Sequence, residues 1–308
     1  MKNKKTTPAG LRKMVQQVVE SSTYRKAYQD NEFIGREELR PVRMQLEILK
    51  PEMVLTESDI RSTVVVFGSA RIQPRQEALK FAAAARRRLA VRPRDPNLQA
   101  RLRAAENLVA LSRYYEEARR FGCMVTKGSQ ADKRHEYVIV TGGGPGIMEA
   151  ANRGAWEAGG KSIGLNITLP HEQKPNAFMT PELSFQFHYF ALRKMHFMMR
   201  ARAMVAFPGG FGTFDELFEA LTLVQTGKKT PLPIILVGKD YWTQVVNTPY
   251  LVEKGMIWPE DLKLIQLVET AEEAWEAIRR YWRQHGGIRD RKRHSLVAMR
   301  ATGSRRDR

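Results

Sequence analysis

A glycine-rich turn followed by a carboxylate is the part of this sequence with the clearest chemical potential. Gly209, Gly210 and Gly212 come after an apolar run, residues 204–207, whose lack of polar alternation predicts a buried parallel strand. Helical periodicity follows them, with Thr213 and Asp215 as candidate caps. We expect a phosphate-binding site here, because backbone N–H groups and the positive end of a helix dipole then converge on one anion.

The carboxylate of Glu216 adds a second chemical function to this turn. We place it in the first turn of the predicted helix, where it would repel a phosphate bound beside it. Glu216 is therefore expected to serve the part of the ligand beyond the phosphate, such as a sugar.

An arginine in an aromatic- and Met-rich stretch upstream is a further candidate. A helix over residues 187–202 would put Phe190, Arg193 and Phe197 on one side. An arginine among such bulky apolar neighbours is partly desolvated and needs an anion. The spacing leaves open whether that anion is structural or a ligand phosphate. Lys194 follows directly.

Two other turns extend the candidate site. A β-branched run at residues 63–67 enters Gly-Ser, as doubly wound folds do where they open onto a ligand. Ser69 could therefore contact a phosphate or sugar, or it could be an ordinary strand end. A second glycine turn lacks the third glycine of the dinucleotide fingerprint. It contributes the candidate substrate-binding residues Gly143, Gly144 and Gly146, and also Glu149, whose alternative role is to complement a helix dipole.

The elements that must position these residues predict an α/β fold with a doubly wound parallel sheet. We expect residues 1–61 to form a helical extension that packs on the core or a sister subunit, and residues 62–285 to form the nucleotide-binding domain. A helical insertion spans about 73–121, a polar loop at 170–184 could cover the site, and residues 286–308 read as a disordered basic tail. The expected strands are 63–67, 137–141, 162–167, 204–207, 232–238 and 262–268.

The net charge of +18 is concentrated in two segments. Residues 71–104 carry a net charge of +8 and residues 286–308 carry +6, whereas residues 105–285 carry +1. A nearly neutral part that holds the motifs, with basic appendages, favours small-ligand chemistry. The appendages leave non-specific binding of RNA or DNA open, and a solvated basic surface is the simpler alternative.

Several classes of protein do not fit this composition. No apolar run approaches the roughly 18–20 residues of a membrane span, and the N-terminus lacks the apolar segment of a secretory signal. The single cysteine, Cys123, excludes an internal disulfide and a multi-cysteine metal site. We expect a cytoplasmic protein with no bound metal and no cofactor.

The central motif, Pro208-Gly209-Gly210-Phe211-Gly212-Thr213-x-x-Glu216 with Arg193-Lys194 upstream, resembles the signature of the LOG family. Its members are cytokinin riboside 5′-monophosphate phosphoribohydrolases and related bacterial nucleotide nucleosidases, many once labelled possible lysine decarboxylases. The resemblance covers roughly residues 62–282 and includes Gly142 to Gly146 and Gln225-Thr226-Gly227. The extension, the long insertion and the tail are closer to longer bacterial members.

The resemblance implies a Rossmann-like fold, a homodimer or higher homo-oligomer with sites near the subunit interface, and a nucleoside 5′-monophosphate substrate. The implied reaction hydrolyses the N-glycosidic bond to free base and ribose 5-phosphate. By the same resemblance Gly209, Gly210, Gly212 and Thr213 hold the 5′-phosphate. Glu216 engages the ribose or the attacking water, and Arg193 completes the catalytic pair. The chemistry agrees, because a carboxylate near C1′ stabilises oxocarbenium character.

Three alternatives stay open. A non-catalytic nucleotide or molybdenum-cofactor carrier would use the same phosphate turn, but retention of Arg193 and Glu216 argues against it. A DNA-binding protein of the related DNA-processing type would explain the charge, but not the near-neutral core. A lysine decarboxylase would need a lysine that binds pyridoxal phosphate, and Lys194 is the lysine near the motifs.

Overall fold

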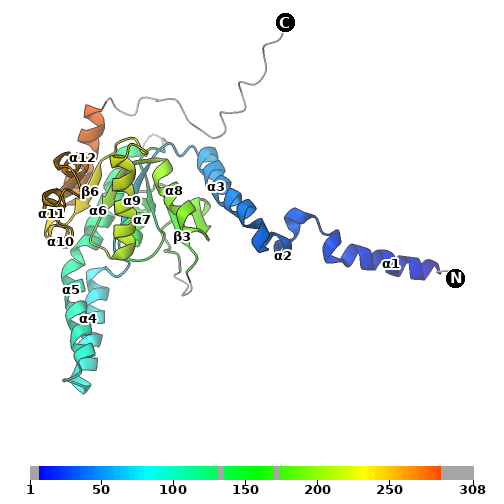
Figure 1. Cartoon of the computed structure of the whole chain (residues 1–308). Helices are drawn as coiled ribbons and strands as arrows, with labels where there is room; N and C mark the ends of the chain where they lie inside the picture. Colours follow the sequence, from blue (N-terminus) through cyan, green and yellow to red (C-terminus); the bar gives the residue numbers. More distant parts are fainter. Residues whose placement is uncertain (1–6, 131–134, 170–173, 286–308) are drawn as a thin grey trace, which may run out of the picture.

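The structure, a computed structural model, describes residues 7–130, 135–169 and 174–285 (Figure 1). The start of the polar loop, 170–173, and the basic tail, 286–308, lie outside the described residues. The predictions of a lid and of a disordered tail are therefore untested there.

A single sheet of seven parallel strands forms the centre of the molecule. The chain runs outward from the middle strand β1 (Thr63–Phe67) in one direction and then continues with β5 (Ala201–Ala206) on the other side of β1. This order confirms the predicted α/β fold and puts the topological switch point between β1 and β5. The other strands are β2 (Val138–Thr141), β3 (Ser162–Ile167), β4 (Ser184–Phe187), β6 (Ile234–Val237) and β7 (Ile265–Val268).

Strand β4 is the element that the sequence reading missed. Its residues alternate between exposed and buried, as expected of a strand that is covered on one face only. It lies at the edge of the sheet, paired with β3 alone. The sequence reading assigned Phe187 to a helix and the residues before Phe185 to a loop, because a four-residue alternation between two stronger patterns is a weak signal.

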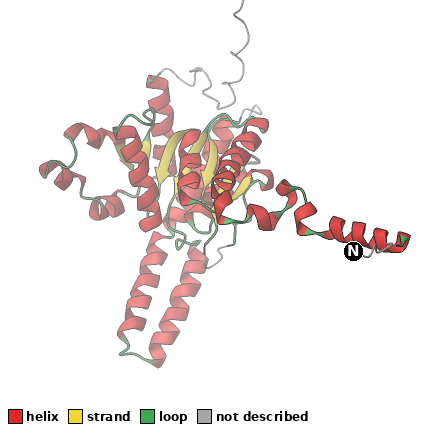
Figure 2. Ribbon diagram, turned by 45° about the vertical axis from the view of Figure 1, so that its right-hand side comes forward, coloured by secondary structure: helices red, strands yellow, loops and turns green. Residues whose placement is uncertain are grey.

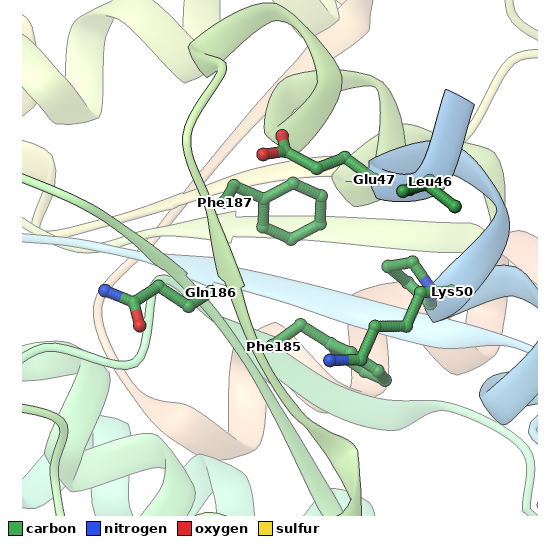
Figure 3. Close-up of a pocket in the computed structure, with 7 residues that line it drawn as sticks. Leu46, Glu47, Lys50, Phe185, Gln186 and Phe187 are labelled. Atoms are coloured by element: carbon green, nitrogen blue, oxygen red, sulfur yellow. The ribbon is translucent and has the colours of Figure 1, made fainter. Parts of the chain in front are cut away.

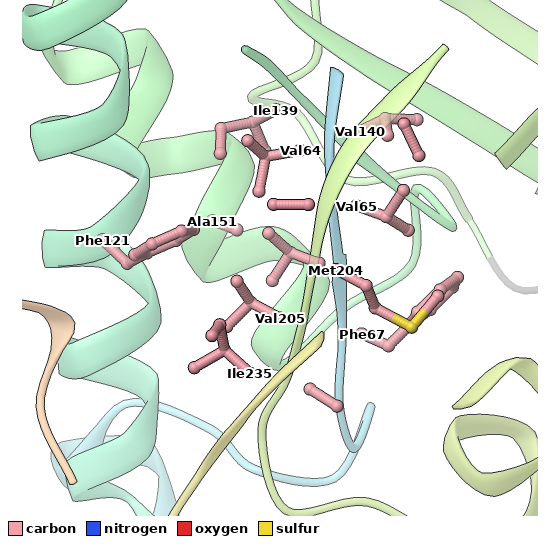
Figure 4. Packing of buried hydrophobic residues seen from close by; sticks show 14 of the residues in the cluster. Val64, Val65, Phe67, Phe121, Ile139, Val140, Ala151, Met204, Val205 and Ile235 are labelled. Carbon is pink, nitrogen blue, oxygen red and sulfur yellow. The ribbon is translucent and has the colours of Figure 1, made fainter. Parts of the chain in front are cut away.

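Helices cover both faces of the sheet. On one face α6 (Arg113–Ser129) and α7 (Ile147–Glu157) contribute Phe121 and Ala151, which lie on the side of Val64 and Ile139 (Figure 4). On the other face Phe67 packs edge-on against Phe197 of α8 (Phe190–Met199), with ring centroids 4.7 Å apart. Ion pairs join α8 to α9 (Phe211–Gln225). Helix α12 (Ala271–Gln284) packs beside α6.

The predicted insertion divides into a projecting hairpin and a core helix. Helices α4 (Arg75–Val91) and α5 (Pro96–Leu111) form an antiparallel pair that stands away from the sheet (Figure 2). The sequence reading continued the second helix to Phe121, but the structure ends it at Leu111 and begins α6 at Arg113. Ser112 separates them, and its Oγ donates to the Val109 carbonyl at 2.7 Å, which turns the chain toward the core.

Helices precede the sheet, as predicted. Helix α3 (Arg40–Glu57) packs against the body, whereas α1 (Pro8–Glu20) reaches away from it and has no buried residue (Figure 1). No described helix has the length and apolar character that a bilayer span requires. The remaining elements are α2 (Asn31–Ile34), α10 (Lys239–Val245), α11 (Thr248–Glu253), and the 3-10 helices Ser22–Tyr24, Ala27–Gln29, Glu37–Leu39, Pro181–Leu183 and Pro259–Leu264.

Candidate active site

The glycine turn after β5 leads directly into α9, as the sequence predicted. Gly209 is there for space: a Cβ on it would lie 2.0 Å from Thr213 Oγ1. A Cβ on Gly210 or Gly212 would meet no protein atom within 4 Å, so the turn is open above these two residues. The hydroxyl of Tyr241 donates to the Gly209 carbonyl at 2.5 Å and fixes the turn from α10.

The first N–H groups of α9 are free to bind an anion. Helix α9 begins at Phe211 with Gly210 as its N-cap, and no side chain caps it. The capping role expected of Thr213 is therefore wrong: the N–H groups of Thr213 and Phe214 donate to the Gly210 carbonyl. Among the described residues, nothing accepts from the N–H groups of Phe211 and Gly212. Such exposed N–H groups at a helix N-terminus favour a phosphate or carboxylate.

Glu216 lies one turn further along α9 than predicted. Because the helix starts at Phe211, the first turn contains no acidic residue and Glu216 falls in the second. The prediction that Glu216 lies in the first turn of the helix is therefore wrong. The separation removes the direct repulsion between a bound phosphate and the carboxylate. It also leaves about 6 Å along the helix axis between Gly212 and Glu216, since each residue adds about 1.5 Å.

Arg193 and Glu216 form a buried ion pair between α8 and α9. Arg193 Nη2 donates to Glu216 Oε1 at 3.1 Å, and the two side chains are only 13% and 5% exposed. The guanidinium lies 5.0 Å from the ring centre of Phe190 and 5.7 Å from that of Phe197, as the predicted helix face required. The structural anion left open by the sequence is thus Glu216. Arg193 Nε is buried without a hydrogen-bond partner among the described residues.

Burial dominates the electrostatics of this pair. It raises the pKa of Glu216 to about 7, and the opposing effects of Arg193 and then Lys194 do not cancel it. Burial likewise lowers the pKa of Arg193 despite the attraction of Glu216. Both directions have one cause, since removing two charges from water costs more than their mutual attraction returns. No described residue donates to the second oxygen of Glu216, Oε2, so it can take a ligand.

Lys194 lies beside this pair and bridges to two other carboxylates of α9. Its Nζ lies 2.7 Å from Asp215 Oδ1 and 3.0 Å from Glu219 Oε2. Burial alone would lower the pKa of Lys194, but the hydrogen bonds to Asp215 and Glu219 outweigh it and raise the pKa. The sequence reading missed Asp215 and Glu219 as partners, although their i, i+4 spacing puts them on one face of α9.

Ser69 connects the two glycine turns. Its N–H donates to the Pro208 carbonyl at 3.0 Å, and its own carbonyl accepts from the N–H of Ile147 at 3.1 Å. Its Oγ accepts from the N–H of Arg71. The ends of β1, β2 and β5 therefore meet at one edge of the sheet, as parallel neighbours must.

The second glycine turn is held by buried amides. Gly146, with φ of 71°, packs so closely on Ser69 that a Cβ would lie 2.4 Å from the Ser69 carbonyl oxygen. The carbonyls of Gly143 and Gly144 accept from the backbone and side chain of Asn176, at 2.9 and 3.1 Å. Asn176 belongs to the predicted polar loop, and its side chain also donates to the buried Asn152. The described part of the loop thus fixes this turn.

Glu149 is not brought to the ion pair. It lies in the first turn of α7, as predicted, and its carboxylate accepts from the hydroxyl of Tyr115 on α6 at 2.8 Å. Neither Arg193 nor Glu216 contacts it. The residues that the structure brings together at one edge are thus Ser69, Gly209, Gly210, Gly212, Thr213, Arg193, Lys194 and Glu216. Gly143, Gly144 and Gly146 flank them through Ser69.

Metal ligands are not part of this arrangement. Within residues 7–130, 135–169 and 174–285, no three His, Cys, Asp or Glu side chains come together to hold a metal ion. The expectation of a metal-free site stays a prediction.

Comparison with known proteins points to one family. Residues 148–278 match the family model described as "Possible lysine decarboxylase". The chain is 26% identical over 159 residues, 49% of its length, to 72% of a probable cytokinin riboside 5′-monophosphate phosphoribohydrolase of Oryza sativa subsp. japonica. It is also 26% identical over 160 residues, 51% of its length, to 73% of such a phosphoribohydrolase of Arabidopsis thaliana.

Solved structures with a similar arrangement include two proteins of molybdenum-cofactor handling. These are the molybdenum cofactor binding protein from Rippkaea orientalis, with a TM-score of 0.41, and the molybdenum cofactor carrier protein from Chlamydomonas reinhardtii, with 0.38. Each is 20% identical and covers 55% of this chain and 87% of its own. Since these TM-scores are below 0.5, the relationship rests on the sequence matches. These matches make the chain a distant relative of the LOG family of plant phosphoribohydrolases over about half of its length.

Proposed function

We propose that this protein hydrolyses the N-glycosidic bond of nucleoside 5′-monophosphates, releasing the base and ribose 5-phosphate. The observation that carries the proposal is the buried Arg193–Glu216 pair beside the open N-terminus of α9. A phosphate acceptor and a carboxylate on one helix, about 6 Å apart along its axis, match the span of a ribose ring. The distant phosphoribohydrolase relatives support the same reaction.

The phosphate would bind at the glycine turn and position the ribose. The free N–H groups of Phe211 and Gly212 and the dipole of α9 attract the dianion. Gly210 and Gly212 leave room for it. Binding energy at the phosphate then holds C1′ beside Glu216. The entropy lost in positioning the reacting groups is thus offset during binding and no longer adds to the activation barrier.

Glu216 would act at C1′. As the C1′–N bond breaks, its electron pair leaves with the base and positive charge develops on C1′, which a carboxylate stabilises. Glu216 Oε2 orients a water molecule and accepts its proton as the water oxygen bonds to C1′, and the departing base takes a proton from solvent. A pKa of about 7 suits a general base at neutral pH. Arg193 fixes the orientation of Glu216 through Oε1.

A decarboxylase that uses pyridoxal phosphate does not fit these residues. A lysine that forms a Schiff base must lose its proton, which requires a lowered pKa. Lys194 has a raised pKa because Asp215 and Glu219 hold it as a cation. We assign Lys194 instead to keeping α8 and α9 in register, with its charge close to the bound nucleotide.

The first test is chromatography of AMP, GMP, CMP and isopentenyladenosine monophosphate after incubation with the pure protein. We expect free base and ribose 5-phosphate from the wild type, and a loss of at least about a hundredfold in rate for Glu216→Gln. Glu253→Gln, a substitution of an exposed carboxylate on α11, serves as the control and should keep full activity. No base from any nucleotide would contradict the proposal.

The phosphate site has its own test by calorimetry with AMP. Gly212→Ala should leave the melting temperature unchanged, because its Cβ meets no protein atom, yet weaken binding by intruding on the ligand. Gly209→Ala should also lower the melting temperature, since Thr213 must move. Tight binding without hydrolysis in the wild type would instead support a nucleotide carrier.

A further inference from the structure

Helix α3 has two apolar faces, of which the body covers one. Its inner stripe, spaced at four, three and four residues, packs on the core and consists of Met44, Ile48, Pro51 and Leu55. Its outer stripe has the same spacing and consists of Val42, Leu46, Leu49 and Met53. These four side chains are 43–55% exposed. A helix that is apolar on two sides is one that is buried on two sides.

Helix α1 also has an apolar face that nothing in the described structure covers. Its apolar residues fall at helical spacing, and each of these side chains is 53–63% exposed: Leu11, Met14, Val15, Val18 and Val19. No residue of α1 is buried. A helix of 13 residues is marginal in water without a packing partner. The chain therefore carries two complementary surfaces, and neither has a partner among the described residues.

The segment between these helices keeps α1 away from the outer stripe of its own α3. Residues 21–39 are folded into short helical turns. Arg43 of α3 donates to the Ile34 carbonyl at 2.7 Å, and also bonds the Arg36 carbonyl, which fastens this segment to the start of α3. Asp30 caps α2 through the Phe33 N–H. Helix α1 consequently points outward (Figure 1).

A hollow beside the outer stripe offers a place for an inserted side chain. It lies between α3 and the edge strand β4, where Leu46 and Lys50 face Phe185 and Phe187 (Figure 3). Its volume is about 210 Å³, enough for one or two apolar side chains. Because β4 pairs on one side only, the hollow runs along an open edge of the sheet.

We propose that α1 of one copy of this chain docks on the outer stripe of α3 of a second copy, with the exchange reciprocated in a two-fold dimer. Nine half-exposed apolar side chains per copy, four on α3 and five on α1, offer on the order of 900 Å² to such an interface. A stable dimer buries about 800 Å² on each partner. A reciprocal exchange also closes the assembly, so that no apolar helix face remains open.

The dimer would reach the candidate active site through α3. The Glu47 carboxylate accepts from the N–H groups of His188 and Tyr189, just before α8 begins, at 2.9 and 3.3 Å. Helix α8 carries Arg193. An α1 helix docked on α3 would therefore stabilise the support of the Arg193–Glu216 pair from behind. The docking itself does not depend on the proposed reaction.

The test combines solution mass with directed cross-linking. By light scattering, Val15→Asp/Val18→Asp and Leu46→Asp/Leu49→Asp should each weaken dimerisation by at least about a hundredfold. Phe81→Asp/Val91→Asp is the control: it adds two charges at exposed apolar positions on the hairpin and should keep the wild-type mass. Unchanged mass in the α1 and α3 variants would overturn the proposal.

Cross-linking separates exchange between copies from folding back within one. In a Cys123→Ser background, a Val15→Cys protein and a differently tagged Leu49→Cys protein are mixed and treated with a short bismaleimide. We expect a covalent heterodimer, and none when Val91→Cys replaces Val15→Cys. If the double variant Val15→Cys/Leu49→Cys cross-links only within single chains, α1 covers its own α3 and the proposal is wrong.

Discussion

At the scale of single residues, the site concentrates charge where water is scarce. Five charged side chains, Arg193, Lys194, Asp215, Glu216 and Glu219, lie within two adjacent helices, and Glu216 is the most deeply buried of them. Its raised pKa means that the ionised pair lowers the stability of the fold, and a strongly shifted pKa of this kind is typical of functional sites.

Glu216 should make the protein less stable as the pH rises from 4.5 to 7. In that window the folded chain keeps a proton on Glu216 that the unfolded chain has lost, so raising the pH favours unfolding. A pKa raised from 4.5 to about 7 corresponds to about 3 kcal/mol. Urea unfolding of the wild type and of Glu216→Gln across this pH range gives the free energy of unfolding of each. The difference between the two isolates Glu216, because all other titrating groups contribute equally to both proteins. A constant difference between the two proteins would contradict the expectation.

The residue types of the site could be predicted from the sequence, but its exact partners could not. The glycines, Arg193 and Glu216 follow from motif and spacing. The contact of Tyr241 with Gly209 depends on how β6 and α10 return to the sheet edge, which no local pattern encodes. The helix begins at least three residues earlier than predicted, because Gly210 caps α9 without a side chain, whereas Thr213 and Asp215 carry the usual capping chemistry.

At the scale of elements, α8 is clamped at both ends. Glu47 of α3 accepts from the two N–H groups before its start. At its end, Arg200 pairs with Glu52 of α3 at 2.9 Å, and Lys229 Nζ donates to the Met198 carbonyl at 2.5 Å. Arg193 therefore sits on a helix whose position is set by α3 and by the segment after α9. A helical extension outside the sheet thus contacts both ends of the helix that carries Arg193.

Glu47→Ala should loosen α8 and the site together. Removal of this carboxylate leaves two N–H groups at the helix start without an acceptor, at a cost of about 1–2 kcal/mol in the free energy of unfolding. We expect reduced nucleotide hydrolysis as well, because Arg193 loses its fixed position. Urea unfolding and turnover measure the two effects. Glu57→Ala, on the same helix and without a partner among the described residues, should change neither.

The elements that the sequence predicted well are those with one strong pattern. Strands β1, β2 and β6 are nearly continuous apolar runs and β3 alternates apolar with small or polar residues, and each lies close to its predicted range. Strand β5 begins earlier than predicted, at Ala201, because Arg202 interrupts the apolar run and its guanidinium lies over the Trp282 ring instead. Packing against Trp282 thus allows an arginine within a strand, although local hydropathy predicts that the strand starts after it.

At the scale of the whole molecule, most of the net positive charge of the described residues lies away from the candidate active site. Helices α4 and α5 bury only Ala78, Ala82 and Ala105, and their arginines lie on an exposed hairpin. Arg86 pairs with Glu106 across it. The hairpin is held mainly by its own two helices, so the sheet does not depend on its outer part.

A shortened hairpin should therefore leave the core intact. Replacing residues 79–107 with a short Gly-Ser linker should keep a cooperative thermal transition within a few degrees of the wild type. The removed segment is strongly basic, so the shortened protein should elute from heparin at a lower salt concentration than the wild type. Differential scanning calorimetry and a heparin column measure these outcomes. Loss of cooperative melting would show that the hairpin supports the fold.

The central place of β1 has a consequence for biosynthesis. Val64 pairs with Ile139 on one side and with Ala203 on the other, so its second neighbour leaves the ribosome long after the first. Until then a half-built sheet exposes an unpaired apolar strand edge, together with the face that α8 later covers. A nascent chain that stalls before β5 therefore displays what chaperones and proteases recognise and also lacks Glu216, so quality control of this protein acts before the helix that carries Glu216 is complete.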